Sequence, residues 1–229
     1  MSALDDARVV LLRHGETSWS TQRRHTGRTD LPLTQRGEEQ AGAAGALLAT
    51  LELRNPLVRT SPRLRAMRTA ELAGLTGAVV DDDLAEWDYG AYEGLTTPQI
   101  RETVPGWTIW TGTAPDGETA QQVRERADRV LDAVTPMLPE RDIVLVGHGH
   151  FSRALIARWA EFDVREGRRF AMSTGALTVL GYEHDAGAVR RAPQGRPRAA
   201  RCAAPPPPPP PPPPADGPPG GGAARRGAA

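Results

Sequence analysis

The 229-residue chain has no lysine, a single cysteine and no long hydrophobic run. One cysteine, Cys202, excludes a disulfide framework and a cysteine-ligated metal site. The first apolar run, 9–12, is only four residues long. That is too short for the core of a signal peptide or for a membrane span, so we expect a cytoplasmic protein. The 28 arginines are balanced by 28 acidic residues, which gives no reason to expect a nucleic acid or a membrane surface as a partner.

The composition changes abruptly at residue 184. Residues 184–229 hold 14 of the 22 prolines, ten of them in the run 205–214, and otherwise consist mostly of Ala, Gly and Arg. Such a segment cannot offset the entropy cost of ordering, so we expect disorder with an extended polyproline II run. The prediction is one domain, 1–183, followed by a tail, 184–229. The tail is either a ligand for a proline-binding domain or an unselected, frameshifted extension.

Short apolar runs alternate with amphipathic segments in the rest of the chain. Strands are expected at 7–13, 57–58, 78–80, 142–147 and 177–182. Helices are expected at 34–51, from Ser61-Pro62 to Gly74 or Gly77, after Pro98, at 119–135 and after His148. This alternation predicts an α/β fold, a three-layer sandwich in which helices flank a mostly parallel central sheet.

Two of the expected strands end in histidine motifs. Arg13-His14-Gly15 follows the first strand, and Gly147-His148-Gly149-His150 follows the strand at 142–147. Ligand sites in open α/β sheets form beyond the carboxyl ends of the strands, and a glycine after each histidine lets the backbone approach a ligand. A single histidine in such a place is more often structural. Two of them, together with Arg13 and the helix that carries Arg65, predict a pocket for a phosphate dianion.

Longer strings around these motifs occur in a fixed order. They are Leu12-Arg13-His14-Gly15-Glu16-Thr17, Thr26-Gly27, Leu33-Thr34-Gln35-Arg36-Gly37, the string 60–70, the string 84–94 and Val146-Gly147-His148-Gly149. With these motifs the chain resembles the histidine phosphatase superfamily, in its phosphoglycerate-mutase-like branch. Within that branch it is similar to mycobacterial acid phosphatases that are often named phosphoglycerate mutases. The resemblance covers residues 7 to about 182.

The resemblance implies roles for individual residues. His14 is expected to be the nucleophile that becomes phosphorylated, and Glu86 the proton donor to the leaving oxygen and then the base for water. Arg13, Arg65 and His148 are expected to bind the phosphoryl oxygens. The expected substrate contacts are Arg13, Ser20, Thr26, Gly27, Arg65, His148, Gly149 and His150. No metal or organic cofactor is implied, the expected partner is a small phosphate monoester, and a homodimer is compatible with the resemblance.

Departures from the family pattern separate a phosphatase from a mutase. The cofactor-dependent mutases have asparagine in place of Ser20 and the string Gln-Gly-Leu-Asn-Lys in place of 93–97. Their longer lid carries paired arginines, whereas 95–118 contains one basic residue here, Arg101. We therefore expect a phosphomonoesterase. The alternatives are a phosphoglycerate mutase and a non-catalytic scaffold that uses the proline run 205–214.

Two further expectations concern the surroundings of the site. His25, Trp107, Trp110 and Phe151 are candidates for a specificity pocket, although aromatic residues in such places are more often part of the core. The expected chemistry also predicts a pH profile with an acidic maximum, because Glu86 must enter the first step protonated while His14 must be neutral.

Overall fold

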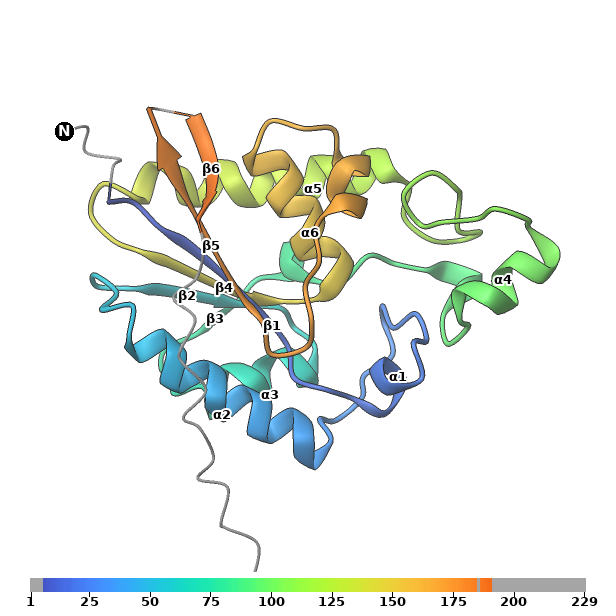
Figure 1. Cartoon of the computed structure of the whole chain (residues 1–229), viewed down its shortest axis with the longest axis horizontal. Helices are drawn as coiled ribbons and strands as arrows, with labels where there is room; N and C mark the ends of the chain where they lie inside the picture. Colours follow the sequence, from blue (N-terminus) through green and yellow to red (C-terminus); the bar gives the residue numbers. More distant parts are fainter. Residues whose placement is uncertain (1–5, 185, 191–229) are drawn as a thin grey trace, which may run out of the picture. The chain divides into compact units, whose positions relative to one another are not determined.

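The computed structural model describes residues 6–184 and 186–190, in which a six-stranded sheet carries helices on both faces (Figure 1). The strands are β1 (Val9–Arg13), β2 (Leu57–Thr60), β3 (Val79–Val80), β4 (Ile143–Gly147), β5 (Leu177–Glu183) and β6 (Ala186–Arg190). Their spatial order is β3-β2-β4-β1-β5-β6. The first four strands along the chain are parallel, and β5 and β6 add antiparallel pairs next to β1. The predicted α/β sandwich with a mostly parallel sheet is confirmed.

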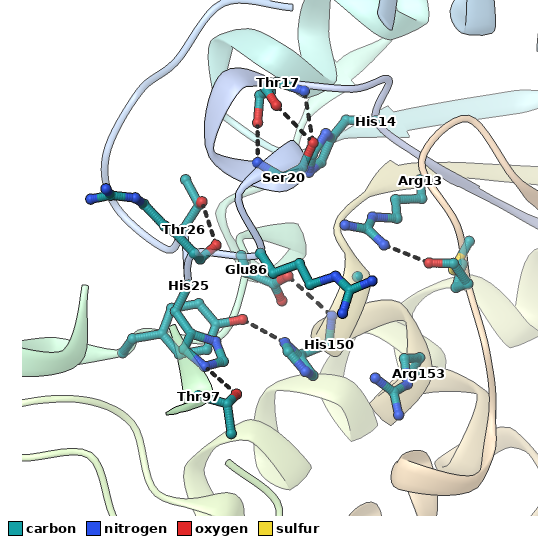
Figure 2. A pocket seen from close by; sticks show the side chains of 15 residues that line it. Arg13, His14, Thr17, Ser20, His25, Thr26, Glu86, Thr97, His150 and Arg153 are labelled. Carbon is teal, nitrogen blue, oxygen red and sulfur yellow. Dashed lines mark hydrogen bonds between the residues drawn. The ribbon is translucent and has the colours of Figure 1, made fainter. Parts of the chain in front are cut away.

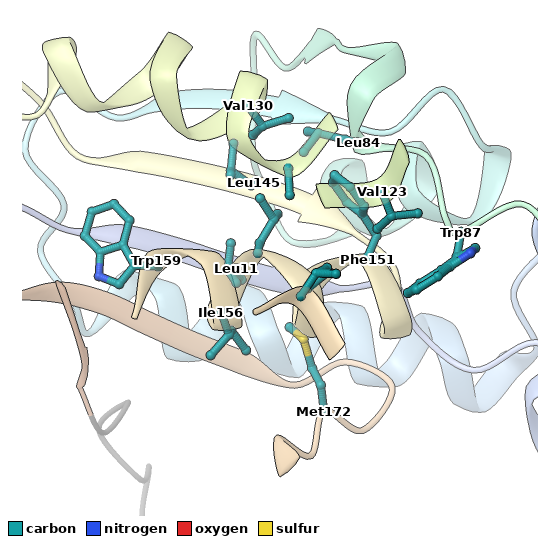
Figure 3. Close-up of a cluster of buried hydrophobic side chains, with 14 of the residues drawn as sticks. Leu11, Leu84, Trp87, Val123, Val130, Leu145, Phe151, Ile156, Trp159 and Met172 are labelled. Carbon is teal, nitrogen blue, oxygen red and sulfur yellow. The ribbon is translucent and has the colours of Figure 1, made fainter. Parts of the chain in front are cut away.

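Each face of the sheet has its own hydrophobic core. Helices α5 (Ala120–Val134) and α6 (Gly149–Trp159) cover one face, and α2 (Gln35–Ala49) and α3 (Leu64–Leu72) cover the other (Figure 1). Side chains alternate along β1, so Leu11 packs with the α5 and α6 core (Figure 3) and Leu12 packs with the α2 and α3 core. Burial on both faces explains why β1 and β4 are continuous apolar runs in the sequence.

Two short helices lie beyond the carboxyl ends of the parallel strands. They are α1 (Ser18–Thr21) and α4 (Thr97–Thr103), and an isolated β-bridge between Arg24 and Thr96 joins their segments (Figure 1). Short 3-10 helices occur at Asp82–Leu84, Gly90–Tyr92, Thr135–Met137 and Val164–Arg169. None of the described helices is long and apolar enough to cross a membrane.

Part of the segment between β3 and α5 packs into the core, while Tyr89 and Thr97 of the same segment line the cavity described below. Trp107, Trp110 and Phe151 are all buried in the core on the α5 and α6 side. For these three residues the core interpretation is therefore the correct one. His25 is the exception among the four candidates, because it lines the cavity described below.

Helix α3 begins later than the sequence suggests. The N-cap is Arg63, which makes no side-chain capping bond, and the helix starts at Leu64 rather than at Ser61-Pro62. Ser61 Oγ instead accepts a hydrogen bond from the Arg63 backbone N–H at 3.3 Å. A serine–proline pair is a typical helix start, but here the serine hydroxyl is committed to the site, and the helix begins two residues later.

The expected domain boundary at residue 183 is wrong for the residues that follow immediately. Strand β6 pairs with β5 in antiparallel register, from Glu183↔Ala186 to Val179↔Arg190, so the boundary falls inside a β-hairpin. A Cβ atom on Gly187 would lie 2.1 Å from the Trp159 carbonyl oxygen, so the hairpin packs directly on the end of α6. The remainder of the predicted disordered tail, including the run 205–214, lies outside the described residues.

Candidate active site

A polar cavity of about 440 Å³ opens at the carboxyl ends of the parallel strands (Figure 2). His14 follows β1, His148 follows β4 and Ser61 follows β2, and these three strands are neighbours in the sheet. The residues that line the cavity are Arg13, His14, Thr17, Ser20, Arg23, Arg24, His25, Thr26, Glu86, Tyr89, Thr97, Gly149, His150, Arg153 and Met172. The parallel topology thus gathers the polar residues that the sequence places after separate strands.

His14 is held as a neutral base. Its side chain is 5% exposed, and burial, reinforced by the charges of Arg13 and Arg65, holds its pKa well below the usual 6.5. The Nδ1 atom lies 2.7 Å from the Gly15 carbonyl oxygen, which can only accept a hydrogen bond. Nδ1 therefore carries the proton and donates it, which leaves a lone pair on Nε2. A neutral imidazole with a free ring nitrogen is able to act as a nucleophile.

The glycine after His14 has a different purpose from the one expected. A Cβ on Gly15 would lie 2.2 Å from the carbonyl oxygen of Gly37, and a Cβ on Gly37 would lie 2.2 Å from the carbonyl oxygen of Glu16. Gly15 thus lets two backbone segments touch, rather than letting a ligand approach. The Gly15 N–H donates to Thr69 Oγ1 at 3.0 Å, so it is already satisfied. These contacts fix the nucleophile loop against α2 and α3.

His148 is oriented by Ser61. The imidazole Nε2 lies 2.7 Å from Ser61 Oγ, and both residues are fully buried. We assign the Ser61 hydroxyl proton to the bond with His148, since Ser61 Oγ already accepts the Arg63 N–H; Nε2 then accepts this proton and Nδ1 carries the ring hydrogen. This Nδ1 is buried without a partner among the described residues, and the ring centroid lies 5.2 Å from that of His14. Burial, followed by the charge of Arg65, holds the pKa of His148 well below 6.5, so the donor is a neutral N–H.

Arg13 and Arg65 bring positive charge to the same place. Arg13 donates from Nη1 to the Met172 carbonyl at 2.5 Å, and Arg65 donates from its Nη atoms to three carbonyl oxygens of the loop 26–29 at 2.9–3.1 Å. The Nε atoms of both are buried without a partner, and no carboxylate of the described residues lies within 4.0 Å of either guanidinium. Burial lowers the pKa of both arginines. An anion with several oxygen acceptors fits this arrangement.

Glu86 approaches the site from the other side and caps α6. Its Oε1 accepts the backbone N–H groups of Trp87 and Phe151 at 2.9 and 2.8 Å, and its Oε2 accepts that of His150 at 3.0 Å. A carboxylate at a helix N-terminus is favourably placed with respect to the helix dipole. Oε2 has a single partner and keeps acceptor capacity, and Glu86 lines the same cavity as His14 (Figure 2).

The other sequence-predicted contacts divide into two groups. Ser20, Thr26, Gly149 and His150 line the cavity together with Arg13. Gly27 does not line it, since its N–H donates to the Glu93 carboxylate at 2.9 Å and its carbonyl accepts from Arg65. Arg65 and His148 are fully buried and are not among the lining residues, so Arg65 acts on the site through its charge, and both offer it an unpaired nitrogen.

Several lining residues were given no role by the sequence. Arg23 and Arg24 come from the loop after α1, Tyr89 follows Glu86, and Arg153 lies on α6. A signal for Arg153 exists in the sequence, because it stands three residues after His150 and therefore on the same face of the helix. Tyr89 Oη lies 2.6 Å from His150 Nδ1, and burial raises the pKa of Tyr89 well above 10, so it remains a neutral phenol.

The comparisons with known proteins agree with this geometry. The family model described as histidine phosphatase superfamily (branch 1) matches residues 9–194. An acid phosphatase of Mycobacterium tuberculosis is 54% identical over 177 residues, which cover 77% of this chain and 87% of that protein. A sedoheptulose 1,7-bisphosphatase of Saccharomyces cerevisiae is 35% identical, with 69% of each chain covered. The solved structure of the open reading frame Rv3214 from Mycobacterium tuberculosis matches with a TM-score of 0.80 and 51% identity, covering 81% of this chain and 96% of that one.

Proposed function

The chain belongs to the histidine phosphatase superfamily, branch 1, and on that premise we propose how its residues hydrolyse a phosphate monoester. The enzyme is a phosphomonoesterase that works through a phosphohistidine intermediate. One observation supports the assignment of roles above all others. His14, neutral and with a free Nε2, lies beside a group of buried donors that have no partner within the described protein.

Three residues are proposed to bind the phosphoryl group. Arg13 and Arg65 supply positive charge and unpaired Nε–H donors, and His148 supplies a neutral Nδ1–H whose direction Ser61 sets. Phosphoryl transfer spreads negative charge over three oxygens, so donors that are fixed before the reaction lower its barrier. The neutral state of His148 matters because a donor that ionised near neutral pH would change the charge of the site.

The proposed first step transfers the phosphoryl group to His14. Nε2 of His14 forms a bond to phosphorus while the bond from phosphorus to the ester oxygen breaks, and Glu86 gives its proton to that oxygen, so the alcohol leaves neutral. In the second step, water loses a proton to Glu86 and attacks phosphorus, and the bond between phosphorus and Nε2 breaks. Inorganic phosphate leaves, and His14 and Glu86 return to their starting states.

A mutase reaction receives no support from the arrangement. A mutase must return the phosphoryl group to a bound acid before water reaches it, and the predicted marker for that is a basic lid. In the segment 95–118 the one basic residue, Arg101, donates from Nε to the Trp107 carbonyl at 2.8 Å. That arginine supports the packing of Trp107 and does not line the cavity.

We further infer that the enzyme is an acid phosphatase. Because the pKa of His14 lies well below 6.5, the nucleophile stays neutral in mildly acidic solution, where a carboxyl group is more readily protonated. The site is thus compatible with the predicted maximum of activity at acidic pH. On an ester with a poor leaving group, activity should be higher at pH 5.5 than at pH 8.5. A homodimer and a cytoplasmic location remain predictions.

The test of the phosphohistidine is the variant His14→Ala. With p-nitrophenyl phosphate as substrate, we expect the release of nitrophenol to fall at least about 10⁴-fold, because the variant lacks the imidazole nitrogen that is proposed to form the bond to phosphorus. Wild-type enzyme quenched during turnover of ³²P-labelled ester should carry acid-labile, base-stable label, and the variant should carry none.

The control is His184→Gln, which removes an exposed histidine outside the cavity and should leave both readouts unchanged. Activity above a few per cent in His14→Ala, or label in that variant, would show that the covalent step does not use His14.

A further inference from the structure

Only two arginines of the described residues are buried, and the proposed mechanism uses one of them. Arg65 is fully buried, and Arg126, on the buried face of α5, is 7% exposed. Arg126 is not among the residues that line the catalytic cavity. Taking a guanidinium out of water is costly unless its donors are used, so the partners of Arg126 indicate what it does.

Arg126 makes five hydrogen bonds, all of them to the segment 83–86 or to Glu118. Its Nη1 donates to the carbonyl oxygens of Asp83 and Ala85 at 2.7 and 2.6 Å, and its Nη2 donates to that of Glu86 at 3.3 Å. Nε and Nη2 also donate to the two carboxylate oxygens of Glu118, at 2.9 and 2.7 Å. A guanidinium has five N–H groups, so Arg126 has none to offer a ligand.

Glu118 extends the same contacts to the other side of Glu86. Its Oε2 also accepts the backbone N–H of Asp88 at 2.9 Å, and its carbonyl oxygen accepts the Nε1–H of Trp87 at 2.9 Å. The backbone N–H of Glu118 in turn donates to the Asp88 carbonyl at 3.0 Å. The pair of Arg126 and Glu118 therefore holds the chain before and after Glu86, from residue 83 to residue 88.

Arg126 also packs on the first turn of α6. Its guanidinium carbon lies 4.0 Å from the centre of the Phe151 ring, as in a cation–π contact. The backbone N–H of Phe151 donates to Glu86 Oε1 at 2.8 Å, and that of His150 donates to Oε2 at 3.0 Å (Figure 2). One guanidinium thus contacts both the segment that carries Glu86 and the helix turn that binds its carboxylate.

We propose that Arg126, together with Glu118, is a positioning residue for the proton donor, and that it holds the Glu86 carboxyl group where the leaving oxygen must be protonated. The inference rests on the proposed function, since it takes Glu86 as the proton donor. A proton donor works only within hydrogen-bond reach of its acceptor, and a displacement of about 1 Å can cost about 10²-fold in rate. Without Arg126, proton transfer to the leaving oxygen should be impaired while the phosphoryl group still binds.

The experiment compares two esters that differ in how strongly their leaving oxygen needs a proton. Phenol has a pKa of about 10, like the tyrosine side chain, whereas p-nitrophenol is a much stronger acid. Phenyl phosphate therefore depends on the proton donor more than p-nitrophenyl phosphate does. The measured quantity is the ratio of kcat/KM for p-nitrophenyl phosphate to kcat/KM for phenyl phosphate. A loss of folded enzyme or of phosphate binding lowers both values and leaves this ratio unchanged.

Arg126→Met removes all five donors and should raise this ratio by about tenfold or more, a part of what a general acid contributes. Arg126→Lys keeps the charge with three donors in place of five and should give an intermediate ratio. The matched control is Arg158→Met. Arg158 is a half-buried arginine that also binds α5, through Asp128 at 2.6 Å, but its other hydrogen bond goes to the Phe162 carbonyl and not to the segment 83–88. Its loss should leave the ratio unchanged.

The variant Glu86→Gln tests whether Arg126 acts through Glu86. Alone, it should raise the ratio at least as much as Arg126→Met, because it removes the transferred proton. Adding Arg126→Met to Glu86→Gln should then leave the ratio unchanged, since residues that act as a unit are not additive. If Arg126→Met does not fold, Glu118→Gln breaks the same ion pair with little change of volume. It should raise the ratio in the wild-type background and not in Glu86→Gln.

The outcomes distinguish the positioning role from the proposed function. A ratio that stays at the wild-type value in Arg126→Met, or in Glu118→Gln where that variant replaces it, overturns the positioning role and leaves the phosphatase intact. A rise that persists in the Glu86→Gln background does the same. An unchanged ratio in Glu86→Gln alone contradicts the assignment of Glu86 as the proton donor, and no phosphate release from either ester by the wild type overturns the proposed function.

Discussion

Two buried groups of charges lie at opposite ends of the same two strands. At the amino ends of β1 and β4, Asp142 is fully buried and pairs with Arg8 at 2.5 Å and with Arg54 at 3.7 Å. At the carboxyl ends, Arg13 is half-buried and Arg65 is fully buried, and neither has a carboxylate of the described residues within 4.0 Å. The first group is balanced by the protein, and the second leaves positive charge for a ligand to balance. The comparison teaches that a buried charge marks a binding site only where the fold does not neutralise it.

The difference between the two groups of charges is tested most directly at the carboxyl ends of the strands. Arg13→Met should lower kcat/KM for p-nitrophenyl phosphate by about 10²- to 10³-fold, because one fixed donor to the developing charge is lost. It should also abolish the rise in melting temperature that inorganic phosphate gives the wild type by binding the folded state. A normal phosphate-induced shift in the variant, measured by differential scanning fluorimetry, would show that Arg13 does not hold the anion.

At the amino end the expected effect is on stability. Asp142→Asn leaves Arg8 and Arg54 without their shared carboxylate, which should cost about 3 kcal/mol in the free energy of unfolding. The phosphate-induced rise in melting temperature should persist, since the site at the other end of the strands is unchanged. Urea unfolding with and without phosphate checks both statements, and loss of the phosphate effect would mean that the two groups are coupled.

The loss of folding stability in acid should also arise from residues at the carboxyl ends of the strands. Burial lowers the pKa of His14, His148 and His150 well below 6.5 and that of His25 to about 4. After unfolding these groups return to about 6.5, so the unfolded chain binds more protons, and stability should fall as the pH drops from about 6.5 toward 4. Each such histidine contributes about 1.4 kcal/mol per pH unit within its window.

Urea unfolding between pH 7.5 and 4.5 measures this loss. His25→Gln should flatten the curve, because it removes one of the neutral buried histidines, whereas His184→Gln, at an exposed position, should not. A wild-type stability that is constant across this range would contradict the assignment of neutral histidines.

The smallest expected effect concerns the edge strand β6, which β5 separates from β1. A chain ended after Glu183 lacks β6 and should lose about 1 kcal/mol or more of stability, because the β5 pairing and the packing of Gly187 on α6 are removed. A chain ended after Arg190 keeps the hairpin and should melt like the full chain, as expected for a segment of the composition of 191–229. Equal melting of the two truncated chains would show that β6 contributes nothing.

Sequence patterns predicted those strands whose position is set by the burial of their apolar side chains. Continuous apolar runs located β1 and β4 because both faces of these strands are buried, and the histidines that follow them then had to meet at one edge. Strand β6 escaped prediction for the opposite reason. Its sequence, Ala-Gly-Ala-Val-Arg, has one aliphatic residue larger than alanine, and its position depends on the backbone pairing with β5.

The site was predictable to the same extent. His14 and His148 follow from their strands, but the cavity lining by Arg153 depends on how α6 is rotated, and the delayed start of α3 depends on a hydroxyl that bonds His148 across 87 positions of sequence. Gly27 was expected at the substrate because it belongs to a family motif. Its N–H and carbonyl instead bind Glu93 and Arg65, which shows that a motif residue can serve the site by holding another residue.

The contact between Gly15 and Gly37 limits how this enzyme can be altered. Since either Cβ would lie 2.2 Å from a carbonyl oxygen of the opposite segment, no pair of larger residues can replace the two glycines while the backbones stay in place. In any chimera or redesign, the loop that carries the nucleophile and the first turn of α2 must therefore be taken from the same parent protein. The loop that bears Arg23 and Arg24 is exposed and has no such lock, so new substrate preferences are more readily obtained there than beside the nucleophile.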